Sequence, residues 1–190
     1  MQLNVLFGFR GNFLTRSDDR KSRGRFRPIS DVGNDLERLI MSYEYRLAAP
    51  EDAATCVDIR GKTRENAYTV EQLEAIGVTV KSWSQGIKDD SLPGYVCLYL
   101  DSIIGYCFGA KETGEIVVLA LLPDYENQGV GKTLLTMMIQ HFENLGFKRL
   151  FLGCSTNPNV RSYSFYRHLN WQPTGILDSH DDEILEYFVD

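Results

Sequence analysis

Two glycines, Gly129 and Gly131, stand where an apolar segment is followed by a long amphipathic one. If a helix begins there, its first backbone N–H groups have no partners within the helix, and the helix dipole adds partial positive charge to them. Glycine also lets an anion approach the backbone closely. The pattern therefore favours an anion site, with a pyrophosphate as the preferred ligand, although a simple glycine-rich turn between a strand and a helix has the same pattern.

The residues around these glycines narrow the kind of phosphate. Gly131-Lys132-Thr133 matches the end of a nucleoside-triphosphate loop, but that loop needs a glycine five residues earlier, where the chain has Glu126. The dinucleotide fingerprint G-x-G-x-x-G needs a third glycine where Leu134 stands. A nucleotide-binding switch is thus disfavoured, and magnesium-dependent binding of ATP or GTP would revive it.

Four segments must position this site. The run Glu115–Leu122 is almost continuously apolar and predicts a strand buried on both faces. Gly129–Leu145 has apolar residues every three or four positions and predicts a helix. Arg149–Cys154 predicts a further buried strand, and Asn159–Leu169 predicts a helix with an aromatic side. The glycines thus lie at the junction of a central strand and the clearest helix.

The rest of the chain alternates between short strands and helices, so the fold class is mixed α/β. The other expected strands are Tyr43–Leu47, Tyr95–Leu100, Ile103–Gly109, Trp171–Leu177 and Glu183–Phe188, with a hairpin turn at Asp101-Ser102. The other expected helices begin at Pro50, at Thr69 with a capping box, and at Val80.

Two motifs in a matching order of elements make the chain resemble one known family. The segment Glu126-Asn127-Gln128-Gly129-Val130-Gly131 is similar to the [Q/R]-x-x-G-x-[G/A] signature of the GNAT N-acetyltransferase superfamily, with Glu126 in place of Gln or Arg. Residues 159–171 keep the Asn, the Phe-Tyr pair and the spacing of the second signature, N-x-x-A-x-x-[FL]-Y-x-x-x-G-F, with Ser162, Asn170 and Trp171 in place of its Ala, Gly and Phe. The resemblance covers about residues 42–190.

The resemblance implies a fold and a co-substrate. It implies a central mixed sheet of about six to seven strands, splayed at its central strands and flanked by about four helices. Acetyl-CoA, without a metal, would lie in the V-shaped gap between Glu115–Leu122 and Arg149–Cys154. The residues that the resemblance assigns to cofactor binding are Leu121, Leu122, Asn127, Gln128, Gly129, Val130, Gly131, Lys132, Thr133, Asn159 and Tyr166.

The resemblance also implies roles in acetyl transfer to an amine. Tyr166 corresponds to the acid that protonates the departing thiolate, which a phenol with a pKa of about 10 can do; the alternative is a packing role. Glu115 corresponds to the base that takes a proton from the amine, and the alternatives are a solvated carboxylate or a water chain. The amide of Leu121 would donate to the oxyanion. Cys154, on a buried strand, is expected to be inert, so transfer is direct.

Two functions compete. The first is an N-acetyltransferase that moves an acetyl group from acetyl-CoA to an amine of a small molecule or protein. The second is a non-catalytic acyl-CoA-binding or regulatory module of the same fold, and the presence of both Glu115 and Tyr166 favours the enzyme. The acceptor would be shaped by Arg60–Trp83 and by the loop Leu177–Glu183, whose acidic residues suit a cationic amine.

The chain of 190 residues divides into a basic N-terminal segment, residues 1–40, which we call the basic preface, and an acidic domain. Residues 1–40 carry a net charge of +3 and the remainder −9, which together give the overall charge of −6. We expect residues 1–41 to be a disordered extension or a start-site artefact, and 42–190 to be the acetyltransferase domain. A transit peptide, a secretory signal and a nucleic-acid-binding arm are the alternatives for the preface.

Composition and cysteine spacing bound the setting of the domain. No apolar run reaches the roughly 18 residues that a membrane span needs, and an acidic domain is not expected to bind nucleic acid. The four cysteines are widely spaced and include no C-x-x-C pair, which indicates thiols in a reducing compartment, and a cytoplasmic location is expected. A homodimer is compatible with this description.

Overall fold

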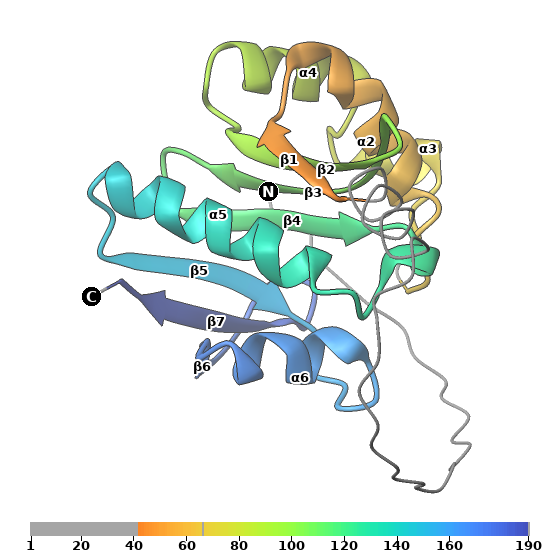
Figure 1. Ribbon diagram of the computed structural model, residues 1–190. Helices are drawn as coiled ribbons and strands as arrows, with labels where there is room; N and C mark the ends of the chain where they lie inside the picture. The colour runs from red at the N-terminus through yellow and green to blue at the C-terminus, as the bar shows by residue number, and fades with distance from the viewer. Residues whose placement is uncertain (1–41, 66, 190) are drawn as a thin grey trace, which may run out of the picture.

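A computed structural model describes residues 42–65 and 67–189, and the basic preface lies outside the described residues. Within this range the chain forms one seven-stranded sheet and five α-helices (Figure 1). The strand order is β1-β2-β3-β4-β5-β7-β6, in which β4 and β5 are parallel and the other neighbours are antiparallel. The predicted mixed α/β sheet of six to seven strands is confirmed.

The elements fall close to their predicted positions. The strands are β1 Glu44–Leu47, β2 Gly94–Tyr99, β3 Ser102–Ala110, β4 Glu115–Leu121, β5 Arg149–Cys154, β6 Gln172–Leu177 and β7 Glu183–Phe188. The α-helices are α2 Ala53–Arg60, α3 Val70–Ala75, α4 Val80–Lys88, α5 Val130–Asn144 and α6 Arg161–His168, with short 3-10 turns η1 Pro50–Asp52 and η2 Pro123–Tyr125. The side chains of Thr69 and Gln72 form the expected capping box at the start of α3.

The hairpin between β2 and β3 turns one residue earlier than predicted. Leu100 and Asp101, rather than Asp101 and Ser102, occupy the two central positions, with φ of 47° and 60°. A two-residue hairpin loop favours positive φ at both of these positions because that backbone twist matches the strands. Leucine is not a residue type that indicates positive φ, so the sequence did not predict this conformation at Leu100, whose side chain is exposed.

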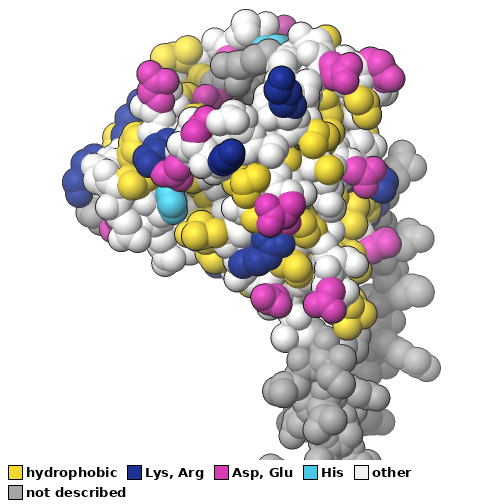
Figure 2. All heavy atoms as spheres, turned by 90° about the horizontal axis from the view of Figure 1, so that it is seen from above, with side chains coloured by type: hydrophobic (Ala, Val, Ile, Leu, Met, Phe, Trp, Pro, Cys, Tyr) yellow, Lys and Arg dark blue, Asp and Glu magenta, His cyan; other side chains and the backbone are white. Residues whose placement is uncertain are grey.

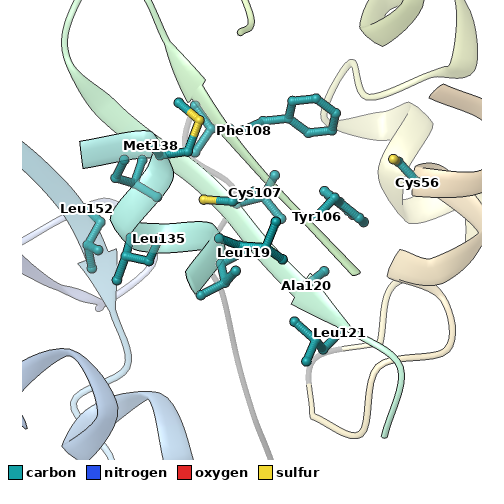
Figure 3. Close-up of a cluster of buried hydrophobic side chains, with 14 of the residues drawn as sticks. Cys56, Tyr106, Cys107, Phe108, Leu119, Ala120, Leu121, Leu135, Met138 and Leu152 are labelled. Carbon is teal, nitrogen blue, oxygen red and sulfur yellow. The ribbon is translucent and has the colours of Figure 1, made fainter. Parts of the chain in front are cut away.

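Helices cover both faces of the central strands. Every residue of β4 is buried. Figure 3 shows Leu119 of β4 on the side of Leu135 of α5, while Tyr106 and Phe108 of β3 lie on the opposite side. On that side Trp83 of α4 meets the Tyr106 and Phe108 rings edge-on, with centroids 5.7 and 5.3 Å away. Packing on both faces holds β4 in place.

The sheet is interrupted between its two parallel strands. β4 and β5 share a single residue pair, Glu115 with Phe151, and Figure 1 shows the two arrows parting toward their C-terminal ends. A bulge in the β3–β4 pairing, which lets Val117 interrupt the register, adds local twist just beyond that pair. The splayed central strands that the resemblance implied are therefore present.

The outer surface carries both charge types. On the face seen in Figure 2, acidic and basic side chains are interspersed with apolar ones instead of gathering by sign. Among the described residues, no helix has the length and hydropathy that crossing a bilayer would require.

Replacing Gly94 should destabilise the sheet because β2 and β3 approach closely there. A Cβ at Gly94 would lie 1.9 Å from the Phe108 ring and 2.7 Å from the Cys107 carbonyl oxygen. Gly94→Ala is expected to lower stability by about 1–3 kcal/mol, because overpacking forces backbone shifts. Gly61→Ala is the comparison: its Cβ would lie 3.3 Å from Tyr68 O, a close contact that a small shift relieves, so it should lower stability clearly less than Gly94→Ala. Thermal unfolding measures both, and equal melting temperatures would contradict the packing argument.

Candidate active site

The N-terminus of α5 is open and requires glycine. Gly129 is the N-cap residue, with φ of 83°, a conformation that L side chains rarely adopt. A Cβ there would meet nothing within 4 Å, leaving aside its two chain neighbours, so the space beside this residue is open among the described residues. Val130 and Leu134 on the next turn are buried and hold the helix start against the core. The start of α5 thus has the open backbone and the rigid support that an anion site would require.

The amides before Thr133 are the ones that remain available to an anion. The Thr133 N–H donates to the Gly129 carbonyl at 3.0 Å, and the Thr133 hydroxyl donates to the same oxygen at 3.2 Å. The backbone N–H of Thr133 is therefore engaged within the helix, unlike the N–H groups of Gln128 to Lys132, which are predicted to bind the same anion. Lys132 is exposed beside the open helix end, where its charge favours an anion.

The edge of β4 that faces the split is free at Leu121 but not at Leu122. The Leu122 N–H donates to the Ile104 carbonyl at 2.9 Å, and its own carbonyl accepts from Tyr125 N–H at 3.1 Å. Successive N–H groups of a strand point to opposite sides, so the Leu121 N–H points away from β3 and toward β5. The Leu121 N–H is therefore directed at the split, whereas the Leu122 N–H is engaged by β3, and the assignment of both residues to cofactor binding stays a prediction.

The side chain of Tyr166 ends in an unsatisfied polar atom. Tyr166 lies on α6 with no exposed surface, and its hydroxyl has no hydrogen-bond partner among the described residues. Its ring packs edge-on against Trp171 at 6.0 Å. Burial raises the pKa of Tyr166 well above its ordinary value, and the nearby Arg60 charge lowers it. The phenol therefore keeps its proton at neutral pH, as a proton donor must.

Glu115 is a buried carboxyl group at the closed end of the split. Only 7 % of it is exposed, and burial, together with the negative charge of Asp178, raises its pKa to about 7. Asp178 lies in the loop between β6 and β7 and accepts hydrogen bonds from the amides of His180 and Asp182. Burial, with the charge of Asp178, also raises the pKa of Asp182 to about 6. The register places this loop beyond Cys154, which pairs with Glu183, whereas Glu115 pairs with Phe151. The charge of Asp178 therefore acts on Glu115 from the open end of the split.

Tyr166 and Glu115 are not adjacent. The Tyr166 phenol is close enough to Cys154, the last residue of β5, for the charge of that thiol to affect its pKa, whereas Glu115 pairs with Phe151 three residues earlier. Three residues of a strand span about 10 Å. Asn159 lies in the exposed loop before α6, which begins two residues later than predicted, and its amide N–H binds the Asn157 side chain at 3.0 Å.

Glu126, the residue that departs from the family signature, is buried in an ion cluster. Its Oε2 accepts from Arg64 Nε at 3.1 Å and from Arg161 Nη1 at 3.2 Å, and its side chain is 4 % exposed. Arg161 also donates to the side chain of Asn127. Burial raises the pKa of Glu126 and the two guanidinium groups lower it. Sequence reasoning missed this cluster, because nothing in the spacing of residues 64, 126 and 161 indicates a contact.

Two buried side chains near Tyr166, those of Arg60 and Cys154, have no predicted catalytic role. Arg60 at the end of α2 is 1 % exposed, and its guanidinium lies over the Tyr68 ring at 4.5 Å from the centroid. The thiol of Cys154 is fully buried and burial raises its pKa, which supports the expectation that it is inert. No group of three His, Cys, Asp or Glu side chains that could hold a metal occurs in the described part of the chain.

Solved structures share this arrangement. The chain is similar to the PaiA N-acetyltransferase of Thermoplasma acidophilum in complex with coenzyme A, with a TM-score of 0.66 and 21 % identity over 78 % of this chain and all of that one. It is similar to YncA of Salmonella typhimurium, solved with acetyl-CoA (TM-score 0.62, 16 % identity, 78 % and 95 % covered), and to the ribosomal-protein-S18-alanine N-acetyltransferase of Escherichia coli (TM-score 0.59, 13 % identity, 78 % and 95 % covered). At these identities the likeness shows the fold.

The sequence itself decides the family. Among curated proteins, none matches the chain significantly. The family model described as acetyltransferase (GNAT) family matches residues 54–171, which is more than half of the chain and includes β4, α5 and α6. The chain therefore belongs to the acetyltransferase (GNAT) family, and the enzyme class predicted from its two motifs is confirmed.

Proposed function

We propose that this acetyltransferase binds acetyl-CoA in the split between β4 and β5 and transfers the acetyl group directly to an amine. The observation that carries the proposal is the buried, unpartnered hydroxyl of Tyr166 on the helix that follows β5. The open N-terminus of α5 and the free edge of β4 at Leu121 suit a pyrophosphate and an amide-containing arm. Bound acetyl-CoA supplies the thioester that the amine attacks.

The residues of the chain divide the remaining work. The amides from Gln128 to Lys132 hold the pyrophosphate at the helix N-terminus, and Asn159 in the loop before α6 is available to the pantetheine arm. The Leu121 N–H donates to the acyl oxygen, where negative charge develops. The Tyr166 hydroxyl gives its proton to the leaving sulfur.

Glu115 is proposed to accept the proton that the attacking amine must lose. With a pKa of about 7 it is both basic enough to accept a proton and partly ionised at neutral pH. The separation of about 10 Å along β5 between the levels of Glu115 and Tyr166 means that a water relays the proton or that the amine reaches down toward Glu115. The carboxylates of Asp178 and Asp182, in the loop that follows the Cys154 level of the sheet, support a cationic amine as acceptor, because each attracts an ammonium group.

The cofactor assignment predicts the effect of a carboxylate at the open helix end. Gly129→Asp should abolish the rise in melting temperature that acetyl-CoA causes in the wild type, because it puts negative charge where the phosphates bind. Gly146→Asp is the matched control: Gly146 follows α5, has φ of 90° and also has open space around it, so backbone strain and charge are equal. Retention of the acetyl-CoA shift in Gly129→Asp would remove the pyrophosphate site from this helix end.

Tyr166→Phe separates catalysis from packing. It removes one buried hydroxyl without a partner and keeps the ring, so stability should stay the same or rise slightly. If the hydroxyl protonates the sulfur, kcat should fall about 10²-fold with unchanged affinity for acetyl-CoA. Tyr163→Phe on the same helix is the control and should keep wild-type kcat. Thiol release from acetyl-CoA with an active amine measures both, and full activity in Tyr166→Phe would favour a non-catalytic role for this residue.

The raised pKa of Glu115 predicts two pH effects. Activity requires the ionised base, so kcat/KM should rise with pH through a midpoint near 7, and Glu115→Gln should lose that limb. Because folding raises the pKa from 4.5 to about 7, the folded protein holds a proton that the unfolded chain releases in this window, so the contribution of Glu115 to stability falls as the pH rises through it.

Glu115→Gln should consequently be more stable than the wild type above pH 7. Glu112→Gln, an exposed residue in the turn before β4, is the control and should change neither the pH profile nor stability. An unchanged pH–rate profile in Glu115→Gln would show that another group is the base.

A further inference from the structure

Three segments that are distant in sequence meet at the carboxylate of Glu126. Arg64 comes from the connection between α2 and α3, Glu126 from the loop between β4 and α5, and Arg161 is the first residue of α6. The two guanidinium contacts, at 3.1 and 3.2 Å, converge on the same oxygen, Oε2. The Glu126 side chain is 4 % exposed and that of Arg161 17 %, so this pair is largely shielded from water, whereas the Arg64 side chain is 46 % exposed.

Further contacts reinforce the junction. Arg161 donates to the side chain of Asn127 as well, so one side chain holds two consecutive residues of the loop that leads to Gly129. The carboxylate of Glu65, next to Arg64, accepts a hydrogen bond from the backbone N–H of Arg161. The connection between α2 and α3 is therefore attached both to the loop before α5 and to the start of α6.

This attachment holds the first residue of α6, while the Arg167–Glu183 ion pair and the packing of Tyr166 on Trp171 hold its later part. The helix has eight residues, and Tyr166 comes five residues after Arg161, about 7.5 Å along the axis. A shift or tilt at Arg161 therefore moves the Tyr166 hydroxyl relative to the loop that carries the anion-binding amides. Misplacement of reacting groups by about 1 Å can reduce a rate about 10²-fold.

We propose that Glu126 is a positioning residue, which fixes α6 and the connection between α2 and α3 to the anion-binding loop and so sets where the Tyr166 hydroxyl meets the leaving sulfur. This inference rests on the proposed function, because it takes Tyr166 as the acid. It assigns a role to the position where the chain departs from the Gln or Arg of the family signature.

The charges in the cluster predict that the rate and the affinity for coenzyme A respond differently to the loss of Glu126. Glu126 neutralises two cations next to the open end of α5. When its carboxylate is replaced by an amide, Arg161 keeps Asn127 as a partner but its charge becomes available to a bound pyrophosphate. Loss of the carboxylate should therefore leave affinity for coenzyme A unchanged or increase it, while the rate falls because α6 is less firmly placed.

Glu126→Gln tests these opposite directions. We expect kcat to fall about tenfold or more, whereas the dissociation constant of coenzyme A, measured by calorimetry, stays the same or falls. Glu126→Asp keeps the charge with a shorter reach and should recover part of kcat. The control is Glu186→Gln, which removes the ion pair with Arg149 at the β5–β7 pairing and should leave kcat and affinity unchanged.

A double-mutant cycle tests whether Glu126 acts through Tyr166. In a Tyr166→Phe background the acid is already lost, so Glu126→Gln should reduce kcat by much less than in the wild type. Full additivity, wild-type kcat in Glu126→Gln, or a loss of coenzyme A affinity that accounts for the whole defect would each overturn the positioning role. Wild-type kcat in Tyr166→Phe alone would instead overturn the acid assignment, so the two failures are distinct.

A second substitution covers the case in which Glu126→Gln does not fold. Arg161→Lys keeps the positive charge but has one ammonium group in place of the guanidinium fork that reaches both Glu126 and Asn127. It should lower kcat about tenfold with near wild-type affinity for coenzyme A. A folded Arg161→Lys protein with wild-type kcat would contradict the proposal in the same way.

Discussion

β4 and β5 pair at Glu115 and Phe151 and then part, and the arrangement of the site follows from that parting. Backbone N–H and C=O groups inside a protein must find hydrogen-bond partners. Where β4 and β5 part, these groups along the two facing edges no longer pair with the other strand, so they are available to a ligand. β4 cannot move to close the gap, because it pairs with β3 along its length and both of its faces are covered by helices. The core is thus what keeps the split open.

Parallel strands bring their C-terminal ends to one edge of the sheet, and here that places the loops after β4 and β5 side by side. The loop after β4 leads into α5 with Gly129 at its cap, and the loop after β5 leads into α6 with Tyr166. The proposed anion site and the proposed proton donor therefore lie at the same edge, although they are distant in sequence. The ion cluster of Glu126 with Arg64 and Arg161 joins these loops directly.

Much of the fold could be predicted from the sequence, because burial patterns reveal elements that are strongly periodic. The apolar run of β4, the repeat of α5 and the capping box of α3 all lie where the pattern placed them. Details that depend on partners could not be predicted: the occupied backbone of Leu122 depends on Ile104 and on the turn of η2. The burial of Glu126 is likewise a tertiary property, since its two partners are 62 and 35 residues away. The positions of Gly129 and Tyr166 came from motifs, whereas their surroundings came from the fold.

The two buried glutamates of the site illustrate how the environment assigns a role to a residue type. Burial raises the pKa of Glu126 above its ordinary value, and the two guanidinium groups on either side of it oppose that rise, so ion pairs let it hold segments together. Glu115 lies in the sheet with Asp178 as a charged neighbour, so both burial and like charge favour its neutral form and bring its pKa to about 7. A carboxylate that must stay charged makes a stable junction, and one that exchanges its proton near neutral pH suits acid–base chemistry. In our proposals the same side chain thus serves attachment at one end of the split and proton transfer at the other.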